Sequence, residues 1–178
     1  MDEPCATLEA SEPIFEGRIF KVHRDRVRLP NGRTVPMEVV RHGPSVVLIA
    51  QPDPDHVVLI KQYRYVIDRW IWELPAGGVD AGEDPARGAA RECAEEINLV
   101  PSSVERLGGF FPTPGFCDEE MVFFRLTGLR AVTADAGPVE KDEDELLSVR
   151  VFSLSEAREL LKRGEIVDMK TVVGLALL

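Results

Sequence analysis

The sequence predicts an α+β sandwich, and three observations support this fold class. Segments with strand and helix patterns follow one another without a regular βαβ alternation. Two strand-like runs near the N-terminus are joined by Pro30-Asn31-Gly32, and Asn-Gly is the strongest short signal for a β-hairpin. The chain has 178 residues, a length that fits one hydrophobic core.

Extended segments dominate the first half of the chain. They are Arg18–Leu29, Arg33–His42, Ser45–Gln51, His56–Tyr65 and Trp70–Leu74. The first two predict a hairpin, and the next two predict a second hairpin across the turn at Pro52–Asp55. The last strand stops at Pro75-Ala76-Gly77-Gly78, where two glycines allow a tight turn. Partial disorder is expected in the first seventeen residues.

Helices are predicted in the second half by their capping residues. Asp84 is a suitable N-cap, Pro85 suits the first helical position, and Asn98 can take the left-handed conformation after a helix that ends at Ile97. Further strands are expected at Val104–Phe111, Glu120–Leu126 and Leu146–Phe152. We expect Ser155 to cap a helix that runs to about Arg163, and Asp168 to cap a final helix.

Composition excludes several classes of protein. The 21 Lys and Arg against 31 Asp and Glu give a net charge of −10, which argues against a nucleic-acid backbone binder. The longest apolar run, Val172–Leu178, is far shorter than the ~20 residues that cross a bilayer, so no membrane association is expected. The three cysteines form no CxxC motif, and the acidic N-terminus is unlike a signal peptide. A cytoplasmic protein is expected.

Part of the acidity is concentrated on one helix face. Glu92, Glu95 and Glu96 are spaced three and four residues apart near the C-terminus of the predicted helix, where the helix dipole disfavours anions. A divalent cation would remove this penalty, because Mg²⁺ prefers oxygen ligands, and Arg91 could brace the carboxylates. An isolated cluster of this kind would be interpreted as a solvated acidic face. Here Gly77 and Glu83 precede it at fixed spacings, which favours a metal site.

The full pattern resembles the Nudix box, G-x5-E-x7-R-E-U-x-E-E-x-G-U, in which U is apolar. The matching stretch is Gly77-x5-Glu83-x7-Arg91-Glu92-Cys93-Ala94-Glu95-Glu96-Ile97-Asn98-Leu99. Cys93 replaces an aliphatic residue and behaves as a small hydrophobe. Asn98 replaces the closing glycine and is the next-best residue for a left-handed cap.

Three further motifs resemble the ADP-ribose and nucleoside-diphosphate-sugar pyrophosphatase branch of that family. They are Gln62-Tyr63-Arg64, Leu74-Pro75-Ala76-Gly77 and Thr113-Pro114-Gly115-Phe116-Cys117-Asp118-Glu119. The resemblance implies a Nudix-type α/β/α sandwich with a mixed central sheet and an N-terminal antiparallel β-hairpin. It also implies an N-terminal segment, 1–42, that packs on or swaps with a partner in a homodimer, followed by a Nudix hydrolase domain at 43–178.

The resemblance further implies a reaction that depends on Mg²⁺ or Mn²⁺. This reaction is hydrolysis of the diphosphate of ADP-ribose or a related nucleoside diphosphate sugar, giving a nucleoside monophosphate and a sugar phosphate. The implied metal ligands are Glu92 and Glu96, completed by Glu95 and the carbonyl of Ala76. Arg91 braces the cluster. Glu83 is interpreted equally well as a support for these ligands or as an ordinary acid near a helix N-terminus.

The resemblance places the catalytic base outside the box, on the loop at 140–145. Glu143 is the first choice by its spacing from the elements that follow, and Glu145 is the second. Either could act if its surroundings raise its pKa.

Other positions are implied to bind substrate. Arg64 is expected to pair with a phosphate, and Glu73 and Glu119 to contact the terminal sugar or a metal-bound water. Phe116, or alternatively Tyr65, could stack on a base or sugar.

Two other functions were weighed. A catalytically silent nucleotide-sensing Nudix module usually loses box carboxylates, whereas this chain keeps Glu92, Glu95 and Glu96. An acidic metal buffer would not need Arg91 or the glycine turn at their spacings. The enzyme is therefore the prediction.

Overall fold

The structure is a computed structural model that describes residues 5–132 and 147–178. The chain divides into two compact units. One unit contains the N-terminal residues up to Pro44 together with Phe111–Glu120, and the other contains Ser45–Phe110 and Met121–Leu178. The division expected at residue 42 placed 111–120 in the second domain, whereas in the structure this segment groups with the N-terminal strands.

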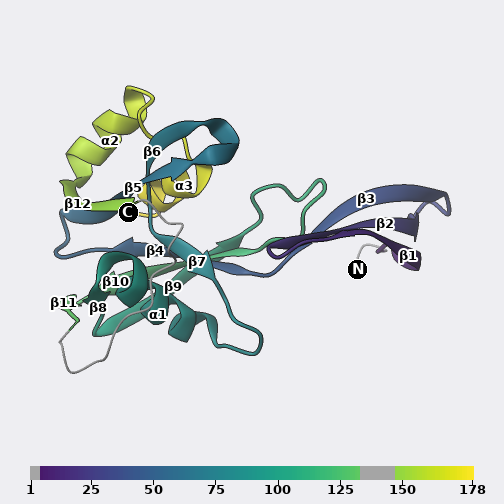
Figure 1. Ribbon diagram of the computed structural model, residues 1–178, viewed down its shortest axis with the longest axis horizontal. Coiled ribbons are helices and arrows are strands. Elements are labelled where there is room, and N and C mark those ends of the chain that lie inside the picture. The colour runs from purple at the N-terminus through teal and green to yellow at the C-terminus, as the bar shows by residue number, and fades with distance from the viewer. Residues whose placement is uncertain (1–4, 133–146) are drawn as a thin grey trace. The chain divides into compact units, whose positions relative to one another are not determined.

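The N-terminal unit is built on an antiparallel sheet in the order β1-β2-β3 (Figure 1). Its strands are β1 (Thr7–Glu16), β2 (Phe20–Arg28) and β3 (Thr34–His42). The predicted hairpin is β2–β3, with Gly32 at a φ of +82° in the turn. The expectation of partial disorder in residues 1–17 is wrong for residues 7–16, which form β1. This strand is almost wholly exposed, so it lacks the apolar alternation that identifies a half-buried strand.

Residues 111–120 are held against β3 by main-chain hydrogen bonds. The Val40 amide donates to the Phe116 carbonyl at 2.7 Å, and the Asp118 amide donates to the Val40 carbonyl at 3.2 Å. These bonds form an isolated parallel bridge between Val40 and Cys117. The loop is therefore an edge addition to the N-terminal sheet.

The second unit contains two main sheets and a short strand pair. The mixed sheet has the order β7-β4-β10-β9, with β4 and β10 parallel, and the antiparallel sheet has the order β12-β5-β6. The strands of the mixed sheet are β4 (Ser45–Ala50), β7 (Ala76–Gly78), β9 (Ser103–Phe110) and β10 (Met121–Thr127). Those of the antiparallel sheet are β5 (His56–Arg64), β6 (Arg69–Glu73) and β12 (Leu147–Ser153), and the short pair is β8 (Leu99–Val100) with β11 (Arg130–Ala131).

The predicted hairpin between β4 and β5 is wrong, although both strands exist. β4 pairs with β7 and β10, while β5 pairs with β6 and β12. Both strands contain a continuous apolar run, at 46–50 in β4 and 57–60 in β5, and such runs are typical of strands covered on both faces. Pro52–Asp55 therefore carries the chain from one sheet to the other.

The predicted helices all form, and one cap differs. α1 (Pro85–Ile97) begins at Asp84, whose carboxylate accepts from the amides of Ala86 and Arg87, and ends at Asn98 with φ 57°. α3 (Met169–Ala176) is capped by Asp168. α2 (Leu154–Lys162) is capped by Ser153 and not by Ser155, because Ser153 forms a capping box with Glu156.

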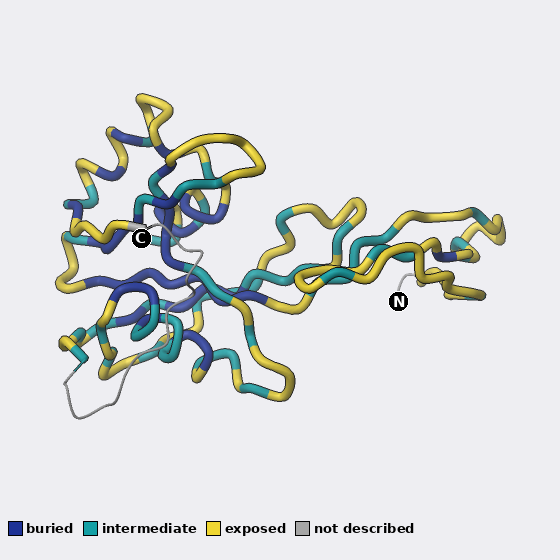
Figure 2. Tube along the Cα trace, in the orientation of Figure 1, coloured by how far each residue is buried: buried dark blue, intermediate teal, exposed yellow. Residues whose placement is uncertain are grey.

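The core of the second unit has two layers, one on each side of β4. Val46, Leu48 and Ala50 pack with α1, whereas Val47 and Ile49 pack with α2 and α3. Figure 1 shows α1 on one side of β4 and β10 and the other two helices on the opposite side, and Figure 2 shows β4 buried along its length. The predicted α+β sandwich with a mixed central sheet is confirmed.

One helix property bears on membranes. Within residues 5–132 and 147–178, no helix combines the length and apolar character that a bilayer crossing requires.

Candidate metal and pyrophosphate site

Gly77 and α1 meet at the edge of the mixed sheet. β7 pairs with β4 there, and the Ala76 amide donates to Glu96 Oε2 at 3.1 Å. A Cβ placed on Gly77 would overlap the carboxylate of Glu92. The absence of a side chain at residue 77 is therefore what admits the Glu92 carboxylate beside the β7 backbone.

Arg91 binds three glutamates from the same region. Its Nε and one terminal nitrogen donate to the two oxygens of Glu83 at 3.1 and 2.9 Å. The other terminal nitrogen donates to Glu92 at 2.7 Å and to Glu95 at 2.9 Å. A further bond at 2.9 Å reaches the Gly78 carbonyl. We call Glu83, Arg91, Glu92, Glu95 and Glu96 the box cluster.

The box cluster carries four carboxylates and one guanidinium. The hydrogen bonds with Glu83, followed by those with Glu92, raise the pKa of Arg91 above its usual range. The same contact with Arg91 lowers the pKa of Glu83, so this glutamate is ionised at neutral pH. One positive charge cannot balance four negative charges, and the cluster therefore favours an additional cation.

The residues of the box cluster fit a hard divalent cation. The cluster offers carboxylate oxygens, and the neighbouring Ala76 offers a carbonyl oxygen; these are the ligands that Mg²⁺ and Mn²⁺ prefer. Gly77 keeps the space beside Glu92 clear of a side chain. Across the described residues, no group of three or more His, Cys, Asp or Glu side chains already converges in metal-site geometry. The glutamates are directed to Arg91 and to the Ala76 amide, so a cation would have to recruit them from these partners.

Cys93 and Asn98, the two departures from the box pattern, have the physical roles expected of them. Cys93 is fully buried in the core beneath α1, and this burial raises the pKa of its thiol to about 12. Such a thiol is a packing group and no nucleophile at neutral pH. Asn98 takes the left-handed conformation at the end of α1 and donates its amide to the Ala94 carbonyl.

Arg64 and Glu73 are brought together by the pairing of β5 with β6. Arg64 donates from Nε and a terminal nitrogen to the two carboxylate oxygens of Glu73, each at 2.7 Å. The hydrogen bonds with Glu73 are the main reason that the pKa of Arg64 is raised, and the charge of Glu96 adds to the effect. Arg64 therefore lies within electrostatic range of the box cluster. Its role toward phosphate, and the role of Glu73 toward the sugar, stay predictions.

Phe116 and Glu119 lie in the N-terminal unit. Phe116 is 57% exposed, and the Glu119 carboxylate is 3.8 Å from His42 Nδ1. The neighbouring Asp118 accepts from Arg41 at 3.0 Å and from the His42 amide at 2.9 Å, which fixes the end of the loop to β3. Their predicted roles in substrate binding are not tested by these contacts.

The two candidates for the catalytic base fall outside the described residues. Glu143 and Glu145 belong to residues 133–146, and their assignment stays a prediction.

Buried polar residues of α3 were missed by the sequence analysis. Lys170 and Thr171 are 8% and 0% exposed, and both bond to residues around β6. Lysine in an amphipathic helix is normally taken as a surface residue, so the pattern gave little indication of this position. A useful signal was the predicted N-cap at Asp168, which directs attention to the first turn of α3.

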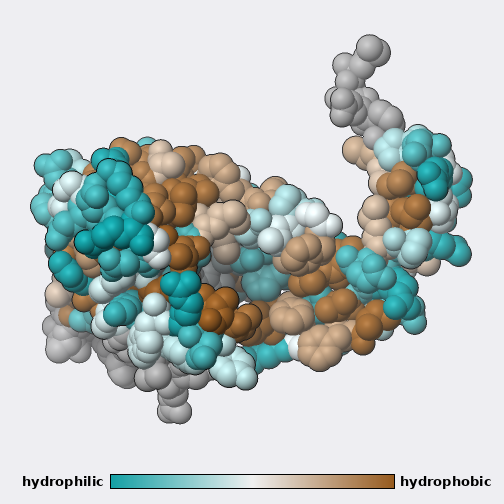
Figure 3. Space-filling model, turned by 90° about the horizontal axis from the view of Figure 1, so that it is seen from above, coloured by the Kyte–Doolittle hydropathy of each residue, from teal (hydrophilic) through white to brown (hydrophobic). Residues whose placement is uncertain are grey.

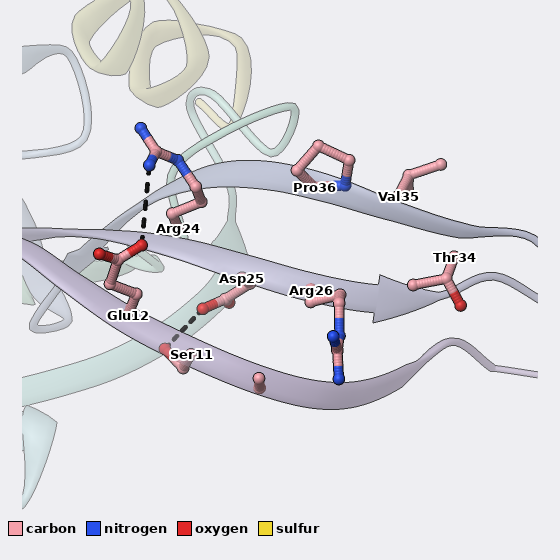
Figure 4. Close-up of a pocket in the computed structure, with 9 residues that line it drawn as sticks. Ser11, Glu12, Arg24, Asp25, Arg26, Thr34, Val35 and Pro36 are labelled. Atoms are coloured by element: carbon pink, nitrogen blue, oxygen red, sulfur yellow. Dashed lines mark hydrogen bonds and ion pairs between the residues drawn. The ribbon is translucent and has the colours of Figure 1, made fainter.

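A surface hollow of about 360 Å³ lies on the N-terminal sheet, and no predicted site residue is among those that line it (Figure 4). Within it Ser11 donates to Asp25 at 2.6 Å, and Arg24 pairs with Glu12 at 3.6 Å. Asp25 is only 2% exposed and also accepts from Arg41 at 2.5 Å. These charges are paired among themselves and hold the sheet together.

Comparison with known protein families gives two matches along the chain. The NUDIX domain matches residues 41–172, and the nucleoside diphosphate sugar hydrolase N-terminal domain matches residues 7–40. The chain belongs to the Nudix family. The predicted class, a Nudix pyrophosphohydrolase of the ADP-ribose and nucleoside-diphosphate-sugar branch, is confirmed, since both family matches fall where the sequence patterns indicated.

Several characterised Nudix relatives align over most of the chain. An ADP-ribose pyrophosphatase of Mycobacterium tuberculosis is 38% identical over 93% of this chain and 79% of its own length. An ADP-ribose pyrophosphatase of Bacillus subtilis is 32% identical over 93% of this chain and 88% of its own. A methanol dehydrogenase activator of Bacillus methanolicus is 38% identical with the same two coverages, 93% and 88%.

A solved structure supports the fold of the Nudix chain. The crystal structure of an ADP compounds hydrolase superposes with a TM-score of 0.84, covering 99% of this chain and 94% of that one. The sequences are 22% identical, so this likeness concerns the fold.

Proposed function

We propose that this Nudix chain hydrolyses the diphosphate of ADP-ribose or of a related nucleoside diphosphate sugar, releasing a nucleoside monophosphate and a sugar phosphate. The observation that carries the proposal is the box cluster, in which Arg91 gathers Glu83, Glu92 and Glu95 beside the bare backbone at Gly77. Two relatives named ADP-ribose pyrophosphatase, 38% and 32% identical, support the choice of substrate.

We assign the cofactor as Mg²⁺ or Mn²⁺. Glu92, Glu95 and Glu96, with the Ala76 carbonyl, would hold it. When bound, such an ion neutralises charge on phosphoryl oxygens and lowers the pKa of a bound water. Arg91 and Glu83 keep the ligand glutamates in place through the hydrogen bonds described above. The excess of carboxylates in the box cluster supports this assignment.

The chain's own residues supply the other parts of the reaction. The guanidinium of Arg64 pairs with a phosphate of the substrate and orients the diphosphate. Glu143 accepts a proton from the attacking water, with Glu145 as the alternative base. Glu73 and Glu119 contact the terminal sugar or a metal-bound water, and Phe116 or Tyr65 stacks on a base or sugar ring of the substrate. Hydrolysis then leaves a phosphate on each product.

A substrate panel tests the proposal directly. ADP-ribose, GDP-mannose, UDP-glucose, GDP-glucose and Ap4A are incubated separately with the protein and Mg²⁺ or Mn²⁺, and the products are identified by mass. We expect AMP and ribose phosphate from ADP-ribose, or the corresponding pair from one nucleotide sugar. Cleavage of Ap4A alone would change the substrate class, and no cleavage of any of the five compounds would reject the proposed activity or require a different substrate class.

A second candidate is a regulator that senses a nucleotide and acts on another enzyme. It is favoured by the Bacillus methanolicus relative, which is named as a methanol dehydrogenase activator. The panel separates the two candidates, because a silent module binds nucleotides without releasing products. Binding by calorimetry with no turnover would support the regulator.

Two matched variants decide between the candidate bases. Glu143→Gln is expected to lower kcat by about a hundredfold or more, the usual contribution of a general base, while Glu145→Gln keeps kcat near the wild-type value. The reverse result would assign the base to Glu145.

We also propose a homodimer formed through the N-terminal unit. Among the residues of β1, β2 and β3, Asp25 is the one that is fully buried, and Leu8, Phe15 and Phe20 are each more than two-fifths exposed. Apolar surface is visible on the face drawn in Figure 3. A three-stranded sheet with so little buried surface is marginally stable alone, which supports a partner covering it.

Light scattering on the purified protein tests the dimer. We expect a mass near twice that of the 19.8 kDa chain, and a mass near that of the single chain for Phe15→Glu. A wild-type protein that elutes as a monomer at all concentrations would contradict the proposal. We also propose that the protein works in the cytoplasm, which is supported by three cysteines, Cys5, Cys93 and Cys117, that form no disulfide.

A further inference from the structure

Arg64 is the exposed end of a network of four charges whose central members are buried. Glu73, at the end of β6, is 1% exposed and accepts two hydrogen bonds from Arg64 and one from Lys170 Nζ. Lys170 in turn donates to Asp168 Oδ2 at 3.0 Å, at the start of α3. We call Arg64, Glu73, Lys170 and Asp168 the balanced network, because it holds two cations and two anions.

Exposure is lowest in the middle of the balanced network and highest at Arg64. The side chains of Glu73 and Lys170 are 1% and 7% exposed, while that of Arg64 is 42% exposed. The buried members therefore fix one end of the guanidinium and leave the rest of it open to solvent. The charge of Glu96 helps to raise the pKa of Arg64, so this exposed group faces the electrostatic field of the box cluster.

Attachment of α3 to the unit does not depend on Lys170. Thr171 Oγ accepts from the Leu74 amide at 2.7 Å, and Leu175 is buried in the core. A Cβ on Gly174 would overlap the side chain of Leu74, which shows how closely α3 packs there. Replacing a whole buried ion pair by apolar groups is often neutral for stability, but removing one partner is destabilising. A loss of stability on removing Lys170 alone therefore says nothing about the reaction, and the role of Lys170 has to be measured in the kinetics.

We propose that Lys170 is a positioning residue for the reaction. It holds the Glu73 carboxylate so that both oxygens face Arg64, and this fixes the plane in which the guanidinium meets the substrate's diphosphate. The proposal rests on the proposed function, in which Arg64 pairs with phosphate. Lys170 itself touches neither substrate nor metal, and it acts through Glu73 and then Arg64.

The test is a double-mutant cycle between Lys170→Met and Arg64→Gln, read as KM and kcat for the substrate found in the panel. We expect Lys170→Met to raise KM about tenfold, the scale of one charge-assisted hydrogen bond, with kcat within about twofold of wild type. In the Arg64→Gln background, Lys170→Met is expected to cause no further rise in KM. Lys162→Met is the matched control, because Lys162 is 71% exposed and pairs with Glu159 on α2.

Two results would overturn the proposal. One is a KM for Lys170→Met within about twofold of wild type. The other is a rise in KM that Lys170→Met causes equally in the wild-type and Arg64→Gln backgrounds, because this would mean a purely structural role. If Lys170→Met does not fold, Asp168→Asn replaces it, since asparagine keeps a cap for Thr171 and weakens the hold on Lys170. A smaller rise in KM that again disappears without Arg64 supports the proposal, and an unchanged KM overturns it.

Binding of inorganic pyrophosphate, measured by calorimetry, separates this proposal from the proposed function. Weaker binding in Lys170→Met, with no turnover of any compound by the wild type, would reject the substrate assignment and keep the positioning role. Turnover by the wild type, with pyrophosphate binding and KM both unchanged in Lys170→Met, would reject the positioning role and keep the enzyme.

Discussion

The box cluster and the balanced network are both built around an arginine that binds glutamate, but they differ in charge. The box cluster has one guanidinium and four carboxylates, three of which bind Arg91, whereas in the balanced network two cations meet two anions. A buried network with equal charges is complete without a ligand. A cluster with excess carboxylates is not, and it gains from a cation. The two clusters use the same residue types, and their charge balance distinguishes the balanced network, a scaffold, from the box cluster, a binding site.

The largest expected effect is at Glu96. Glu96→Gln keeps a carbonyl oxygen for the Ala76 amide but removes a metal ligand, so we expect kcat to fall about a thousandfold with the fold intact. In EDTA its thermal midpoint is expected to equal or exceed that of the wild type, because one of the crowded carboxylates is gone. Steady-state kinetics and thermal melts measure the two effects.

The matched control for Glu96 is Glu159→Gln, at a 59% exposed position on α2. It is expected to leave kcat unchanged. A Glu96→Gln enzyme with a wild-type rate would refute the metal assignment.

In the balanced network, loss of a carboxylate is expected to destabilise the protein. Glu73→Gln leaves Arg64 and Lys170 with one anion in a buried setting, and we expect the free energy of unfolding to fall by about 3 kcal/mol. Urea denaturation with and without EDTA gives the value, which should not depend on metal. A loss below about 0.5 kcal/mol would mean that water solvates the network and that the contrast with the box cluster is invalid.

Gly77→Ala tests the geometry of the box cluster without changing its charge. The added Cβ would overlap the Glu92 carboxylate, so the carboxylate must move. We expect the loss in the free energy of unfolding and the rise in the activation free energy from kcat to sum to about 2 kcal/mol. Gly78→Ala is the matched control, because a Cβ there has nothing within 4 Å. Equal kinetics and stability for the two variants would show that the close approach at Gly77 does not matter.

The smallest effect concerns pH and Glu83. Its pKa lies below the ordinary value of 4.5, since Arg91 binds the ionised form, so the stability it adds is present at higher pH and lost as pH falls. Metal-free Glu83→Gln is expected to be less stable than wild type by about 1 kcal/mol at neutral pH. The difference should begin to shrink as pH falls below 4.5 and be lost as pH passes through the lowered pKa of Glu83, and a difference that does not shrink with falling pH would exclude this origin.

Local signals were enough to predict α1 and the residues on it. Asp84, Pro85 and Asn98 define its ends through backbone chemistry that neighbouring residues supply, and the spacing of Glu92 and Glu96 puts both on the face toward β7. The motif also predicted a tight turn at Gly77, but the close approach of the Glu92 carboxylate to this residue was found only in the structure.

Long-range pairing could not be predicted in the same way. The sequence of a buried apolar strand does not indicate which strand it pairs with, so β4 was predicted to pair with β5 although it pairs with β10. The exposed strand β1 lacks the periodic pattern that would have predicted it. The burial of Lys170 could not be predicted because its anionic partner, Glu73, lies far away in the chain. Roles for Phe116 and Glu119 depend on substrate contacts that spacing does not encode.

The parallel pairing of β4 with β10 also has a consequence for how the protein is made. During synthesis β4 leaves the ribosome early, yet its register with β10 can form only after Met121–Thr127 has been translated. Until then a wholly apolar segment has no partner on that side, which slows folding and exposes the nascent chain to aggregation. Expression at low temperature or with chaperones should therefore raise the yield of folded protein, and fragments that stop before β10 should be insoluble.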